Sequence, residues 1–120
     1  MTRAELVRLA LLLSIADDYE DIPHIGSVIA EKLAPCGVAV NEEEIRRTLI
    51  DFIGTGLARA YWLWGPGPNE EIQGVPPLET FQDYYFGITE EGLRVLSVWQ
   101  KQWTLDDEGE LRPGWSPPSE

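Results

Sequence analysis

The densest group of side chains that could bind a cation lies in the segment DDYEDIPH, residues 17–24. Carboxylates combined with an imidazole are ligands that divalent cations accept in proteins. The segment lacks the spacing of a calcium-binding loop, and it joins two predicted helices, where exposed acidic residues are common. We therefore expect no metal here, although the segment supplies five possible ligands: Asp17, Asp18, Glu20, Asp21 and His24.

The two residues best suited to nucleophilic catalysis, Cys36 and His24, each occur once. Both lie on or beside one predicted helix, far apart along it, so the thiol and the imidazole are not expected to meet. The glycines of GPGPN, residues 65–69, lack the lysine and the following helix of a phosphate-binding loop. The sequence therefore predicts a protein that is not an enzyme and needs no cofactor.

Charge limits the class of partner. The chain has 120 residues, with 21 acidic and 9 basic side chains, and a net charge of -12. Such a chain repels phosphate and anionic lipid at long range. We expect its partners to be proteins or small molecules.

The compartment is inferred from two features. A single cysteine forms no internal disulfide and fits a reducing environment. The apolar run ALLLSIA, residues 10–16, is too short to span a bilayer, and its flanking charges do not match a signal peptide. We expect a cytoplasmic protein without a membrane partner.

Three helices are predicted in the first half of the chain. Residues 3–19 are apolar nearly all round, which indicates burial on more than one side. A second helix covers about 23–34, with Pro23 in its first turn and Pro35 as its terminator. The third begins after Asn41, with Glu44 placed for a capping box, and ends near Gly54 or Gly56.

The second half predicts two strands and a helix. Residues 57–64 alternate and are rich in aromatics, so they indicate a strand. Residues 65–80 contain four prolines and three glycines and predict a long loop, followed by a strand over about 81–88. Thr89 is placed to cap a final helix over about 90–103. The fold class is mainly α with a small β-hairpin.

This order resembles a winged helix-turn-helix domain, with a three-helix core, a two-stranded wing and a C-terminal helix. EEEIRRTLIDFIGTGLARAYW is similar to the recognition helix and first wing strand of bacterial winged-helix regulators. YYFGITEEGLRVL is similar to the return strand and following helix of the MarR and PadR groups. The resemblance covers about residues 4–100. It implies DNA contact through the third helix and wing, and dimerisation through the terminal helices.

The outer face of the third helix presents few cations for DNA. The candidate partner-binding residues are Arg46, Arg47, Ile50 and Arg59. Acidic residues, which repel phosphate, surround them on the helix and on the hairpin tip. We expect a non-catalytic adaptor or regulatory module that binds protein. The alternative is a transcriptional regulator that binds DNA through the third helix and wing. A DNA-mimicking inhibitor is a third possibility, and only the net charge motivates it.

The terminal helices predict association. The first helix has more apolar faces than one core needs, and the last helix ends near a tryptophan. We expect a homodimer through residues 3–19 and 90–103, or coverage by the acidic, proline-rich tail 104–120 that follows the domain 1–103. The residues predicted to make these contacts are Leu11, Leu12, Trp103 and Trp115.

Overall fold

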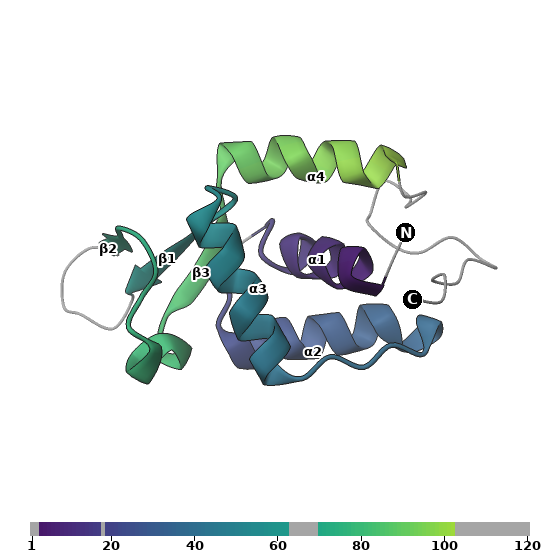
Figure 1. The fold of residues 1–120 in the computed structure, drawn as a ribbon, viewed down its shortest axis with the longest axis horizontal. Helices are drawn as coiled ribbons and strands as arrows, with labels where there is room; N and C mark the ends of the chain where they lie inside the picture. The colour runs from purple at the N-terminus through teal and green to yellow at the C-terminus, as the bar shows by residue number, and fades with distance from the viewer. Residues whose placement is uncertain (1–2, 18, 63–69, 103–120) are drawn as a thin grey trace.

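The fold consists of packed α-helices with a small antiparallel sheet at one end of the molecule (Figure 1). The computed structural model describes residues 3–17, 19–62 and 70–102. Its helices are α1 (Arg3–Ser14), α2 (Ile22–Leu33), α3 (Glu42–Gly54) and α4 (Glu90–Gln102), with short 3-10 segments η1 (Ala34–Cys36) and η2 (Leu78–Asp83). Its strands are β1 (Ala58–Trp62), β2 (Glu70–Ile72) and β3 (Tyr85–Ile88).

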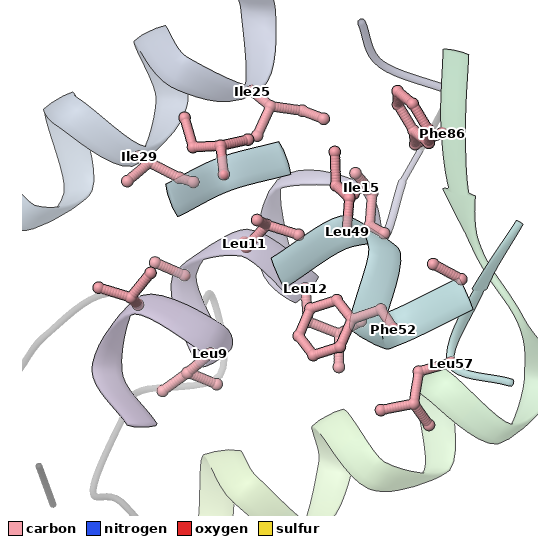
Figure 2. Close-up of a cluster of buried hydrophobic side chains, with 14 of the residues drawn as sticks. Leu9, Leu11, Leu12, Ile15, Ile25, Ile29, Leu49, Phe52, Leu57 and Phe86 are labelled. Carbon is pink, nitrogen blue, oxygen red and sulfur yellow. The ribbon is translucent and has the colours of Figure 1, made fainter. Parts of the chain in front are cut away.

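Helix α1 is the centre of the core. It contacts α2, α3 and α4, and in Figure 1 it lies between α2 and α4. This enclosure explains the apolar pattern all round the helix. Figure 2 shows Leu11 and Leu12 among Leu49 and Phe52 of α3 and Ile25 of α2, and all five side chains are fully buried.

The first helix is shorter than predicted. It ends at Ser14, whose Oγ donates a 2.6 Å hydrogen bond to the Leu11 carbonyl, and not at residue 19. The following residues approach β3: Ile88 N–H donates to the Ile15 carbonyl, and Glu20 and Phe86 exchange backbone hydrogen bonds of 2.9 and 2.8 Å. Pairing with the sheet therefore ends the helix early, although the local sequence could continue it.

The starts of α2 and α3 follow local capping rules. Asn41 Oδ1 accepts a 2.8 Å hydrogen bond from Glu44 N–H, as predicted. Asp21 Oδ1 caps α2 by accepting from His24 N–H at 3.0 Å, and Pro23 lies in the first turn as predicted. Each cap satisfies an amide that the helix itself leaves unpaired.

The sheet has three strands where the sequence predicted two. The strand order is β2-β1-β3, with every pair antiparallel. The loop predicted over 65–80 contains β2, because Ile72 pairs with Ala60 and packs against the core. The strand predicted over 81–88 is also wrong at its start: residues up to Asp83 form η2, whose Phe81 is buried against Phe86 with ring centroids 5.0 Å apart.

Thr89 joins the sheet to α4, as predicted. Its Oγ1 accepts from Gly92 N–H at 2.9 Å and donates to the Gly56 carbonyl at 2.6 Å. Gly92 has no side chain to keep the backbones apart: a Cβ there would lie 2.3 Å from the Leu57 carbonyl oxygen. The first turn of α4 is therefore held tightly against the turn between α3 and β1.

Among the helices in the described ranges, none combines the length and the apolarity that crossing a bilayer requires.

Candidate functional site

The outer face of α3 carries two of the predicted partner-binding residues, and both are engaged within the helix. Arg46 Nη2 lies 2.8 Å from Glu42 Oε1, and Arg46 Nη1 lies 3.4 Å from Glu43 Oε2. Arg47 Nε lies 3.7 Å from Glu43 Oε1. These pairs join residues three or four positions apart, the spacing at which side chains on a helix meet. The acidic first turn of α3 thus partly neutralises its own arginines.

Three further arginines are paired across elements. Arg59 Nε of β1 lies 3.3 Å from Glu71 Oε1 of β2. Arg3 and Arg8 of α1 reach α3, where Arg3 Nη1 lies 2.5 Å from Glu44 Oε2 and Arg8 Nη1 lies 2.6 Å from an Asp51 carboxylate oxygen. With Arg94 paired to Glu91, each of the six arginines in the described ranges has a carboxylate partner.

Two carboxyl groups titrate below their usual range because of these pairs. The hydrogen bond from Arg3 lowers the pKa of Glu44, and the hydrogen bond from Arg94 lowers the pKa of Glu91. Both groups are thus held in the charged form to a lower pH than free glutamate.

The side chain of Ile50 is less exposed than predicted. Its side chain is half-buried and packs against the core, so only part of it is available to a partner. Arg47, Arg46 and Arg59 remain accessible to different extents, with side-chain exposures of 72%, 25% and 41%. The structure brings Arg46 and Arg47 together through Glu43, whereas Arg59 belongs to a separate pair on the sheet.

The predicted contact residues of α1 do not form a subunit surface. Leu11 and Leu12 are both 0% exposed within the chain, because α1 is enclosed by the other helices. These leucines, predicted to contact a second subunit or the tail 104–120, belong to the buried core of the domain. Trp103, Trp115 and the tail 104–120 lie outside the described residues.

A groove lies between α2 and α4, over the end of α1. Its volume is about 630 Å³. Its apolar lining consists of Leu13 of α1, Ala16 just after that helix, Val28 of α2, and Leu93 and Leu96 of α4. Leu93 is 49% exposed, so about half of this side chain is in contact with solvent. Helical spacing does not predict this groove, because it forms only where three helices meet.

The polar lining of the groove includes part of the predicted metal-binding segment. Asp17, Glu20 and His24 line the groove, and so do Lys32 and Gln100. Glu20 Oε2 lies 3.2 Å from His24 Nε2. Within residues 3–17, 19–62 and 70–102, no three His, Cys, Asp or Glu side chains are placed to share a metal ion.

Tyrosines gather on the sheet face that points away from the core. Tyr19 stacks on Tyr61 with ring centroids 4.1 Å apart, and a Cβ on Gly87 would lie 2.8 Å from the Tyr19 ring. Burial and the neighbouring Tyr19 raise the pKa of Tyr61. This cluster covers the strand at Gly87. It was not predicted, because Tyr19 was expected at the end of the helix over residues 3–19.

The two described tryptophans have partners within the domain. Trp62 contacts Tyr84 with ring centroids 5.1 Å apart, and Trp99 contacts Phe52 at 6.5 Å. Trp99 packs against the core, as expected for a large aromatic under a helix.

Searches of protein-family models, curated proteins and solved structures returned no match to this chain.

Proposed function

We propose that this protein is a cytoplasmic, non-catalytic winged-helix module that acts by binding another protein. The observation that carries the proposal is the pairing of arginines on α3 and β1 with the chain's own carboxylates. A phosphate would have to displace these carboxylates before it could gain the arginine contacts.

The cost of that displacement matters because phosphate contacts supply most of the affinity of proteins for DNA. Of the residues on the DNA-facing side in the winged-helix hypothesis, Glu42, Glu43 and Glu71 each lie beside an arginine and repel phosphate. A protein surface tolerates this mixture better, because it can present cations to the glutamates and carboxylates to the arginines.

The winged-helix part of the proposal is supported by the element order. Three helices precede an antiparallel sheet that leads directly into α4, and the segment after α1 pairs with β3 at Glu20 and Phe86. In this proposal α3 corresponds to the recognition helix, and β1 and β3 correspond to the two wing strands, of the bacterial regulators that the sequence resembles. Fold alone does not assign a function, so the proposal of a protein partner rests on the charge pairing.

A DNA titration tests the proposal. Anisotropy of a fluorescein-labelled random duplex at about 50 mM salt should show no binding at micromolar protein. The double variant Glu42→Gln/Glu43→Gln should gain measurable, salt-sensitive binding, because it frees Arg46 and Arg47. Wild-type binding that falls steeply with salt, and that Arg46→Ala/Arg47→Ala weakens, would support the DNA-binding regulator instead.

Photo-crosslinking tests the protein partner directly. A photoreactive residue at Arg47 should label one protein species in a lysate, and excess unlabelled wild type should compete the label away. The same residue at exposed Ala30 on α2 is the matched control and should not label that species. Equal labelling from both positions would count against a partner surface on α3.

We also propose a homodimer. Of the two terminal helices expected to form it, only α4 has exposed large apolar residues, within the described ranges, that support it. Because α1 is enclosed, the large apolar side chains that are exposed on the described parts of α1 and α4 are Leu93 and Val98, at 49% and 46%. Sedimentation at micromolar concentration should give a dimer that Val98→Glu dissociates. A monomeric wild type would eliminate this association.

A further inference from the structure

We propose that the groove between α2 and α4 binds a small amphipathic organic cation, with its apolar body on the groove floor and its ammonium group at the end of α1. This inference goes beyond the proposed function. It concerns a different surface from the outer face of α3, so either can fail alone. It shares Leu93 with the homodimer proposal, and at that residue a ligand and a second copy are alternatives.

The size and chemistry of the groove suit a small molecule. Its volume of about 630 Å³ is within the range of ligand pockets, roughly 300–1,000 Å³. Leu13, Val28, Leu93 and Leu96 supply an apolar floor from three different helices. Leu93 remains half-exposed, so a ligand would remove apolar surface that the described part of the chain leaves in contact with solvent.

The charge at one end of the groove selects a cation. Asp17 and Glu20 both line the groove next to the C-terminal turn of α1. The carbonyl end of a helix carries partial negative charge, and α1 has no basic residue in its last turn to offset it. Two carboxylates and a helix C-terminus therefore favour positive charge at the same place.

The basic groups of the lining do not cancel this preference. Lys32 lies eight residues after His24 on α2, which corresponds to about 12 Å along the helix. His24 Nε2 lies 3.2 Å from Glu20 Oε2, so the imidazole already interacts with that carboxylate. The Asp17 carboxylate is not part of this pair. All six arginines of the described ranges are paired with other carboxylates, none of which is Asp17 or Glu20.

This acidic pair differs from an ordinary exposed acidic loop because an apolar floor lies beside it. A free metal ion would gain nothing from Leu93 and Leu96, and an uncharged apolar compound would gain nothing from Asp17 and Glu20. A compound that carries both parts uses the whole groove. The net charge of -12 also raises the local concentration of cations.

Three compounds with one apolar body and different charges test the inference: 4-phenylbutylamine, 4-phenylbutanol and 4-phenylbutyrate. Each is titrated into the full-length protein at neutral pH and followed by amide chemical shifts. The amine should bind with a Kd of about 1 mM, the usual scale for so small a ligand, and shift the amides of Val28, Leu93 and Leu96. The alcohol should bind several-fold more weakly, and the acid should not bind measurably.

Variants locate the site. Asp17→Asn and Glu20→Gln should each weaken amine binding about 3-fold and leave the alcohol unchanged, because they remove charge only. Leu93→Ser should weaken both compounds about 10-fold. Glu31→Gln, an exposed change on α2 outside the groove lining, is the matched control and should change neither.

Two results would overturn the inference. Equal affinity for all three compounds would mean that charge plays no part. No binding of any compound, together with a change in sedimentation on Leu93→Ser, would assign the groove to a second copy of the chain.

Discussion

Helix α1 has eight apolar residues among its twelve and α4 has five among its thirteen, and the fold buries the two sets differently. Helix α1 is enclosed by α2, α3 and α4, and it buries Leu6, Val7, Leu9, Leu11 and Leu12. Helix α4 packs on α1 through one side and leaves Leu93 and Val98 about half exposed. A continuous apolar pattern therefore indicates how many sides of a helix are covered, but not whether its own chain or a partner covers them.

The largest expected effect separates the two helices directly. Leu12→Ala should destabilise the protein by about 3–4 kcal/mol, because it removes a fully buried side chain and leaves a cavity. Leu93→Ala should cost less than about 1 kcal/mol, because half of that side chain is already in water. Urea unfolding followed by circular dichroism measures both. Similar losses for the two variants would contradict the contrast between α1 and α4.

The junction that orients α4 should be the next most sensitive. Gly92→Ala should cost about 2–3 kcal/mol, since the new Cβ would lie 2.3 Å from the Leu57 carbonyl oxygen, a backbone atom that cannot rotate away. Gly54→Ala is the matched control, because a Cβ at that helical position meets nothing within 4 Å. Thermal unfolding of the two variants measures the difference. A Gly92→Ala protein as stable as wild type would show that α4 can move off the turn without cost.

Removing the cap of α4 should have a smaller effect. Thr89→Ala loses the hydrogen bond from Gly92 N–H and the one to the Gly56 carbonyl, and should cost about 1 kcal/mol. Thr89→Ser keeps both hydrogen bonds and should recover most of the loss. If serine fails to recover it, the threonine methyl group rather than the hydroxyl would be the stabilising part. Urea midpoints of the three proteins distinguish these cases.

The smallest effect concerns the ion pair between α1 and α3. The pKa of Glu44 is lower in the folded protein, so its contribution to stability is present above the unfolded value near 4.5 and is lost as pH falls through the folded value. Arg3→Gln should reduce the stability at pH 7 by less than about 1 kcal/mol, because both side chains are partly exposed. It should also flatten the acid limb of the stability curve. An unchanged slope below pH 4.5 would mean that Arg3 does not hold Glu44 charged.

The sequence was most informative where structure depends on neighbours along the chain. The caps at Asn41 and Thr89, the proline in the first turn of α2 and the start of α4 all follow from residues within four positions. The sequence was less informative for the sheet. Strand β2 is only three residues long, and Ile72 is in a strand because it pairs with Ala60 of β1. The early end of α1 likewise depends on β3, far along the chain.

The candidate site also has some features that follow from the local sequence and others that depend on tertiary packing. Arg46 and Arg47 could be placed on the outer face of α3 from helical spacing, and their pairing with Glu42 and Glu43 is local. The burial of Leu11 and Leu12, and the groove beside Leu93, could not be predicted from that spacing. They depend on which helices pack around α1.

The sequence by itself determined the composition, the acidic charge, the helix starts and the mainly helical class with a small sheet, because these depend on residue type and short spacing. The tertiary structure decided three further features. It enclosed α1, it paired Arg3 with Glu44 across 41 positions and Arg8 with Asp51 across 43, and it opened a groove between α2 and α4. Contacts over such separations exist only after the helices have packed, because no local rule brings the two side chains together.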